Sequence, residues 1–256
     1  MNGPVNGSES PNGVAGLRSS LALSIPAAIL AVALALGLNQ VGDGFAARSE
    51  SGISVTGSAR VNATADNAVW TLNVNATSPT LSAAVASVND DMEQLVSYLK
   101  DGGFPADAIQ LGALATYGNE EWVNGNSTGR ILSHRAERPV TVRSKDVNLV
   151  ASMSNGIGLL LERGVQINNF GPNYYISSLK ELRPELLKEA MIDAQSRAKA
   201  IVESTGGKVG VAVSVRSGPF QVTSPDSVDT SAGGYYDTST IEKTVTATVT
   251  ATFKTE

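Results

Sequence analysis

The chain of 256 residues contains no cysteine and a single histidine, His134. Without thiols, the sequence excludes disulfides, thiolate metal sites and cysteine nucleophiles. One histidine also excludes metal sites built from several histidines. No phosphate-binding loop is present either, so we expect no metal and no cofactor.

Charged residues are also scarce, at 17% of the chain, and the net charge is -5. The sequence has no basic stripe with interleaved aromatic residues, and an acidic chain repels the phosphate backbone. We therefore expect no nucleic-acid partner. A hydrophobic content of 42% is typical of a globular protein, and the length allows one large domain or two small ones.

The first fifty residues are organised differently from the rest of the chain. Residues 1–20 are rich in Gly, Asn, Ser and Pro and predict a flexible polar tail. Residues 21–38 contain no charge, and a helix of this length spans about 27 Å, close to the thickness of a bilayer core. Residues 39–51, with Gly42, Asp43 and Gly44, predict a linker.

The apolar run of residues 21–38 has two readings, because Pro26 shortens the helix to a length that also suits a signal peptide. A cleavage site after Ala46 fits the second reading. We favour an uncleaved membrane anchor over a cleaved signal, and either over a buried core helix. Arg18 precedes the run, which predicts that the body lies outside the cytoplasm.

From residue 52 the sequence predicts an α+β domain with three main helices and antiparallel or mixed sheets. The first two strands, 53–62 and 67–77, are expected to form a hairpin. Segments 118–129 and 224–240 are polar and predict long loops. Further strands are expected at 108–117, 130–143, 165–177 with a bulge near Gly171, 209–216 and 243–256.

Apolar residues at helical spacing predict the three helices, and each ends at a glycine. The first is expected to start at Ser78 as the cap with Pro79 in its first turn. The second covers 145–163 and is weakened in the middle by Gly156. The third covers 182–204 and carries a surface ion pair four residues apart, Asp193 with Arg197.

The last strand alternates strictly between apolar residues and threonine. One side of it carries Val245, Ala247, Val249, Ala251 and Phe253. This pattern predicts a strand with one buried face. We expect the apolar face to pack on the third helix, and the threonine face to meet water or a neighbouring subunit.

The body of the chain resembles the SIMPL domain family, which includes bacterial periplasmic immunogenic proteins. The resemblance rests on "VTGSARV", on "YYISSLKELRPELLKEAMIDAQSRAKAIVESTGGKVGVAVSV" and on the closing alternating strand. It implies a two-lobed α+β domain over residues 52–256, located in the cell envelope and often preceded by a signal or anchor. Some members assemble into rings or cages, and the family supplies no established catalytic motif.

The segment "GNSTG", Gly125–Gly129, matches the G-x-S-x-G pattern that surrounds the catalytic serine of many hydrolases. That pattern requires a sharp turn from a strand into a helix, which exposes the serine beside a histidine. Ser127 instead lies in a segment predicted as a polar loop, with His134 on the following strand. We favour a chance match, and an envelope hydrolase that uses Ser127 is the alternative function.

Large aromatic residues in polar segments are the candidate interface positions, because such residues bury much area at little entropic cost. Folding back over the sheet edge is the equal alternative for them. The candidates are Trp122, Tyr235 and Tyr236, together with Thr246, Thr248 and Thr250 on the polar face of the last strand.

Taken together, these patterns predict a noncatalytic protein of the cell envelope, anchored to the membrane through residues 21–38 if they are not cleaved. Its domain is expected to form a homo-oligomer or to serve as a structural or binding module for an unidentified ligand.

Overall fold

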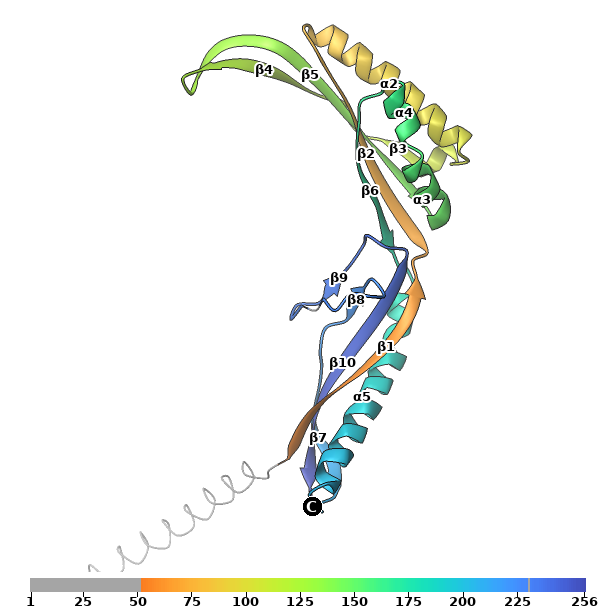
Figure 1. Ribbon diagram of the computed structural model, residues 1–256, viewed down its shortest axis with the longest axis vertical. Coiled ribbons are helices and arrows are strands. Elements are labelled where there is room, and N and C mark those ends of the chain that lie inside the picture. Colours follow the sequence, from red (N-terminus) through yellow and green to blue (C-terminus); the bar gives the residue numbers. More distant parts are fainter. Residues whose placement is uncertain (1–51, 230) are drawn as a thin grey trace, which may run out of the picture.

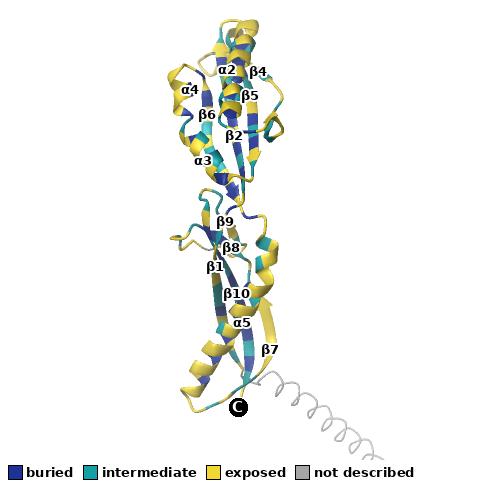
Figure 2. Cartoon of the chain, turned by 90° about the vertical axis from the view of Figure 1, so that its right-hand side faces the viewer, coloured by how far each residue is buried: buried dark blue, intermediate teal, exposed yellow. Residues whose placement is uncertain are grey.

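A computed structural model describes residues 52–229 and 231–256. The predicted tail (1–20), apolar segment (21–38) and linker (39–51) fall outside the described residues. The described part is α+β, as expected, and is elongated, with two lobes stacked end to end (Figure 1 and Figure 2). Each lobe contains one five-stranded sheet with helices on one side. Within this part, no helix combines the length and apolarity needed to cross a bilayer.

The lower lobe is built around β10 (Glu242–Thr255), which pairs from Glu242 to Phe253 with β1 (Ile53–Thr64). The other side of β10 pairs with two shorter strands, β7 (Val209–Ser217) and β8 (Gln221–Thr223). These pairings are antiparallel, whereas β8 pairs in parallel with β9 (Tyr235–Tyr236). The long helix α5 (Leu179–Glu203) packs along β1 and β10.

The two-faced prediction for the last strand is confirmed. Its apolar side chains are buried, and Ala251 and Phe253 pack against Ala194 and Ala198 of α5. The threonines of the opposite face remain half-buried or exposed. The predicted pair of Asp193 with Arg197 is also present on α5, with carboxylate oxygen and Nε 2.9 Å apart.

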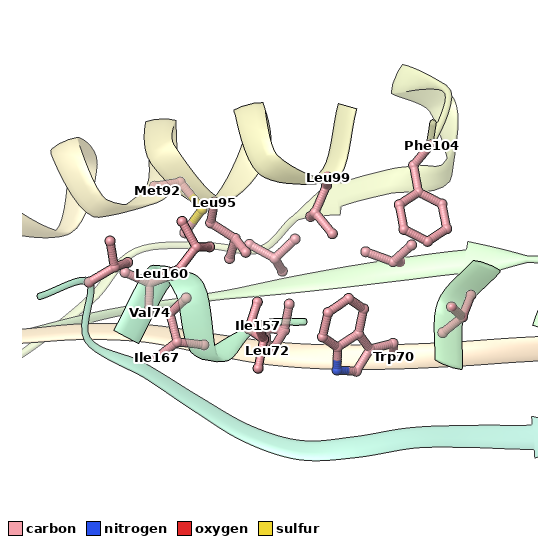
Figure 3. Close-up of a cluster of buried hydrophobic side chains, with 14 of the residues drawn as sticks. Trp70, Leu72, Val74, Met92, Leu95, Leu99, Phe104, Ile157, Leu160 and Ile167 are labelled. Atoms are coloured by element: carbon pink, nitrogen blue, oxygen red, sulfur yellow. The ribbon is translucent and has the colours of Figure 1, made fainter. Parts of the chain in front are cut away.

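The upper lobe has the strand order β3-β5-β2-β6, and β4 pairs with another stretch of β5. Its strands are β2 (Asn67–Ser78), β3 (Ile109–Leu111), β4 (Ala115–Val123), β5 (Asn126–Ser144) and β6 (Ile167–Tyr175). Its helices are α2 (Leu81–Asp101), α3 (Val147–Asn155), α4 (Gly158–Glu162) and the short η1 (Ala106–Ala108). Alternate residues of β2, including Trp70, Leu72 and Val74, form the core with Leu95 and Leu99 of α2 (Figure 3).

The predicted hairpin of the first two strands is wrong, because β1 and β2 belong to different sheets. Only Ala65 and Asp66 separate them, and neither has the positive φ that a two-residue hairpin turn requires. The Ala65 N–H instead donates to the carbonyl of Ile241, and the Asp66 N–H to the carbonyl of Tyr175. The chain therefore runs directly from one lobe into the other.

The helix boundaries need three corrections. Thr80, not Ser78, caps α2, and its Oγ1 accepts from the Ala83 N–H at 3.3 Å. Ser78 is still paired in β2, which leaves it unable to act as the cap. The second helix splits at Gly156 into α3 and α4, and α5 starts three residues earlier than predicted.

The segment 118–129 is not a loop. β4 and β5 run antiparallel through it, and their turn lies at Asn124 and Gly125, which have φ values of 53° and 80°. An Asn-Gly pair with positive φ at both residues is the preferred two-residue hairpin turn, which the polar composition obscured. The expected bulge in β6 is confirmed, since its register with β2 shifts beside Gly171.

Candidate interaction surfaces

The hairpin of β4 and the first half of β5 projects from the upper lobe as a curved, two-stranded arm, residues 115–137 (Figure 1). Among the described residues, β4 pairs with no strand other than β5. A two-stranded ribbon is marginally stable in water by itself. The arm nevertheless exposes five large apolar side chains, namely Tyr117, Trp122, Val123, Ile131 and Leu132.

Trp122 is the largest of these side chains and is 66% exposed. It lies in β4 opposite Ser127 of β5, one residue before the end of the strand. The prediction that it lies in a loop is therefore wrong. In a strand next to a tight turn, the indole cannot fold back over the body of the sheet, because the ribbon holds it away from the lobe.

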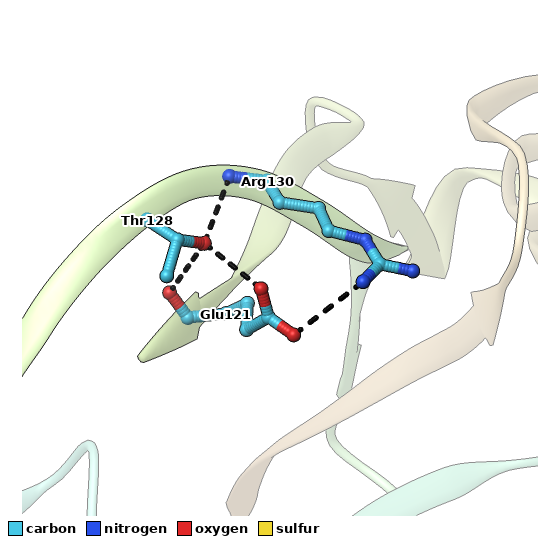
Figure 4. Close-up of polar contacts among 3 residues, drawn as sticks. All are labelled: Glu121, Thr128 and Arg130. Carbon is cyan, nitrogen blue, oxygen red and sulfur yellow. Dashed lines mark hydrogen bonds and ion pairs between the residues drawn. The ribbon is translucent and has the colours of Figure 1, made fainter. Parts of the chain in front are cut away.

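A polar network on the arm joins Glu121, Thr128 and Arg130 (Figure 4). Thr128 Oγ1 donates to the Glu121 carboxylate at 3.0 Å, and the Arg130 N–H donates to Thr128 Oγ1 at 3.3 Å. Arg130 Nη1 lies 3.6 Å from the same carboxylate, with 72% of the arginine side chain exposed. Exposed ion pairs contribute little free energy, so this network orients the two strands more than it stabilises them.

The structure does not bring Ser127 and His134 together. Both lie in β5, seven residues apart, which corresponds to about 23 Å along an extended strand. The Ser127 hydroxyl instead donates to the carboxylate of Glu120 and accepts from the Gly129 N–H at 3.1 Å. No strand-to-helix turn follows the serine, so the geometry that the hydrolase pattern requires is missing at this position.

The two adjacent tyrosines have different environments. Tyr235 is 41% exposed, in keeping with an interface position. The Tyr236 hydroxyl accepts a hydrogen bond from the Ile176 N–H at 2.8 Å, and its ring lies 6.1 Å from that of Tyr175. The Tyr236 side chain thus folds back onto the domain, which is the alternative to an interface position.

The candidate threonines lie where the alternation predicts, on the face of β10 away from α5. Thr250 is exposed, whereas Thr246 and Thr248 are half-buried. Thr250 Oγ1 lies 2.9 Å from Thr56 Oγ1 of the neighbouring strand β1. The polar face is therefore already organised into cross-strand contacts within one chain.

Lys243, a buried lysine at the junction of the lobes, was not predicted as a site residue from the sequence. Lys243 is fully buried, and its Nζ donates to the carbonyl oxygen of Asp237 at 2.6 Å. Burial lowers the pKa of Lys243, and the charge of Asp237 opposes this effect in part. The alternation of the last strand already indicates its burial, because Lys243 lies two residues before Val245 and therefore falls on the core face.

The pKa of Asp237 reflects several opposing effects. Burial by itself raises this pKa, but hydrogen bonds from the side chain and N–H of Ser239 and the charge of Lys243 lower it overall. The Ser239 contacts measure 2.7 Å and 2.6 Å. The Asp237 carboxylate and the Lys243 amine thus both have hydrogen-bonding partners, which is typical of a structural role.

A groove of about 630 Å³ lies between the outer edge of β1 and α5. Ala59, Val61, Leu182 and Leu186 contribute to its lining, together with the carboxylate-bearing residues of α5. At one end the Asp193 carboxylate accepts a hydrogen bond from the Ser58 N–H at 2.8 Å. Over residues 52–229 and 231–256, no three acidic or histidine side chains lie close enough together to hold a metal ion.

Comparison with known proteins identifies the body of the chain. A model of the SIMPL family, described as a protein of unknown function (DUF541), matches residues 53–253, from the start of β1 to Phe253 in β10. No match was found among curated proteins. The family match covers both lobes and well over half of the sequence. The chain therefore belongs to the SIMPL family, a family of unknown function.

Proposed function

We propose that this chain is a noncatalytic structural module of the cell envelope whose body lies outside the cytoplasm and assembles with copies of itself. The observation that carries the proposal is the arm, which exposes five large apolar side chains on a ribbon whose strand β4 pairs, among the described residues, with β5 alone.

The arm is costly to maintain in a monomer. A tryptophan buries about 150–250 Å² when it is covered, and apolar burial contributes about 25 cal/mol per Å². Covering Trp122 and its apolar neighbours would thus stabilise the arm by several times RT. Large aromatic side chains among polar ones are typical of protein interfaces.

A second copy is the partner that we favour over an unrelated protein. The resemblance to SIMPL proteins implies ring-like or cage-like assembly in some members. A projecting arm suits such an assembly, because an arm that contacts a different surface on the next copy makes a head-to-tail contact, and such contacts form a ring when the rotation between copies closes.

The proposed location rests on the sequence. The uncharged segment of residues 21–38 follows Arg18 and precedes the body. If it is an anchor with the arginine on the cytoplasmic side, the body lies on the other side of the membrane. Cell fractionation with protease added to intact membranes tests this, and digestion of the body from the cytoplasmic side would contradict it.

The assembly is tested by light scattering of the purified full-length chain in a mild detergent. The intact chain is expected to have a molar mass several times that of the monomer, and Trp122→Ser is expected to lower it. Ile201→Ser is the matched control, since Ile201 is 52% exposed on α5, in the other lobe. A monomeric intact chain at all concentrations would overturn the proposal.

A further inference from the structure

Strand β7 is an exposed edge of the lower sheet. It pairs with β10, and no second strand pairs with it among the described residues. All residues from Val211 to Ser217 are exposed, including the side chains of Val211, Val213 and Val215 at 71%, 53% and 57%. Figure 2 shows the strand as a continuous exposed ribbon beside α5. Such an edge presents free N–H and C=O groups that favour pairing with another strand.

The sequence of this edge is unusual. Residues 209–215 read "VGVAVSV", with no charge and no proline. The stretch is nearly palindromic about Ala212, since valines stand at equal distances on both sides and the two intervening residues, Gly210 and Ser214, are both small. An antiparallel pair of identical strands places residues at equal distances from the centre opposite one another. The palindrome therefore matches valine with valine.

The opposite edge of the same sheet is protected. The Asp193 carboxylate of α5 accepts a hydrogen bond from the Ser58 N–H of β1, and the helix backbone crosses directly over Gly57. A Cβ atom at Gly57 would lie 2.2 Å from the Ala190 carbonyl oxygen. Covering an edge with a helix or with charged groups is how proteins prevent strand addition. In β7 the stretch 209–215 carries no charge, and its residues from Val211 onward are exposed.

We propose that β7 pairs antiparallel with β7 of a second copy about a two-fold axis at Ala212, which joins the two lower sheets into one. Val209 would lie opposite Val215 of the second copy, and Val211 opposite Val213. The inference rests on the proposed self-assembly and identifies one of its contacts.

The size of this contact predicts that it is weak when alone. Seven residues span about 23 Å, and a junction about 10 Å deep buries on the order of 500 Å² in total, below the roughly 1,200 Å² of a stable dimer. The register of β7 with β10 shifts on both sides of Phe253, and such irregularities limit regular pairing further. The contact therefore suits a reversible junction that acts together with other contacts, such as the arm.

The charges at the two ends of β7 give a direct test. In this register Lys208 lies opposite Arg216 of the second copy, so the pair carries like charges at both ends. Lys208→Glu or Arg216→Glu alone would place opposite charges there and is expected to lower the dimer Kd by about tenfold. The double variant restores like charges and should return the Kd close to that of the intact chain.

Sedimentation of the full-length variants in detergent measures these constants, with thermal melts to confirm that each variant is folded. A double variant that binds as tightly as the single ones would overturn the register, as would single variants that leave the Kd unchanged.

Crosslinking supplies a second, independent test. Because the chain lacks cysteine, Ala212→Cys introduces one thiol per copy, which lies at the proposed axis. A short bismaleimide is expected to yield a covalent dimer with Ala212→Cys but not with Val228→Cys, whose position is 92% exposed in a loop. Oligomers that persist without Ala212 crosslinking would refute the β7 contact and leave the proposed self-assembly standing, whereas a monomeric chain would refute both.

Discussion

The carboxylate of Asp193 on α5 accepts a hydrogen bond from the backbone N–H of Ser58 on β1 at 2.8 Å. The same carboxylate lies 2.9 Å from Arg197 Nε. This side chain thus fixes the helix to the edge of the sheet and binds an N–H group that would otherwise be free to donate to another strand. The Ser58 N–H and then Arg197 lower the pKa of Asp193 below its ordinary 3.8.

This lowered pKa predicts how stability depends on pH. A carboxylate that is more acidic in the folded state stabilises it above its ordinary pKa, and this contribution is lost as the pH falls through the folded-state pKa. Asp193→Asn keeps an oxygen acceptor but does not titrate, so its melting temperature should fall less steeply below pH 4. Asp90→Asn, on the exposed side of α2, controls for the loss of one carboxylate, and equal acid dependence in all three proteins would contradict the prediction.

Gly57 is expected to be intolerant of any side chain. A Cβ atom there would lie 2.2 Å from the Ala190 oxygen and 2.3 Å from the Ala194 nitrogen, both of which are helix backbone and unable to rotate away. Gly57→Ala should therefore destabilise the protein by about 1–3 kcal/mol or more, as overpacking does. Gly233→Ala is the control, since a Cβ atom at Gly233 meets nothing within 4 Å. Denaturant unfolding compares the two, and similar stabilities would show that α5 moves aside freely.

The two faces of β10 should respond differently to a charge. Val249→Asp places a carboxylate at a position that is 3% exposed, which is expected to cost several kcal/mol. Thr248→Asp, on the half-buried polar face, should leave the chain folded. Thermal melts of the two variants test this prediction, and equal losses of stability would mean that both faces of β10 are buried.

Ser127→Ala is expected to change the free energy of unfolding by less than about 0.5 kcal/mol, because the residue is exposed on the arm. No hydrolase activity is expected to depend on it, since His134 lies too far along the same strand to take its proton. The measurement is turnover of simple ester substrates by both forms. A hydrolase activity that disappears in the variant would reassign the protein to the enzymes.

Lys243 should give the protein an alkaline pH dependence. Burial lowers the pKa of this lysine below its ordinary 10.5, so between the two pKa values the unfolded chain binds more protons than the folded one. Stability should therefore rise with pH across that interval, as the buried amine loses its charge. Lys243→Met removes the titrating group, and melts at alkaline pH up to 10.5 should show a flatter dependence. An unchanged slope in Lys243→Met would assign the effect to other groups.

Several features were determined by the sequence alone. The alternation in β10 predicted which side chains, from Val245 to Phe253, would be buried, because the pleat of a strand sends successive side chains to opposite faces. Helical spacing likewise predicted α5, whose buried residues recur every four positions from Leu186 to Val202, and the motifs of the body predicted a SIMPL domain. These features depend on residues close together in the chain.

Other features were decided only by the tertiary structure. β1 and β2 look like a hairpin in sequence, yet each pairs with a strand more than fifty residues away, because strand pairing depends on which edges the fold brings together and not on the periodicity of one segment. The arm that displays Trp122, the contact of Asp193 with Ser58, and the free edge of β7 arise in the same way. Each depends on what the rest of the fold covers or leaves open, and that is settled only when distant segments meet.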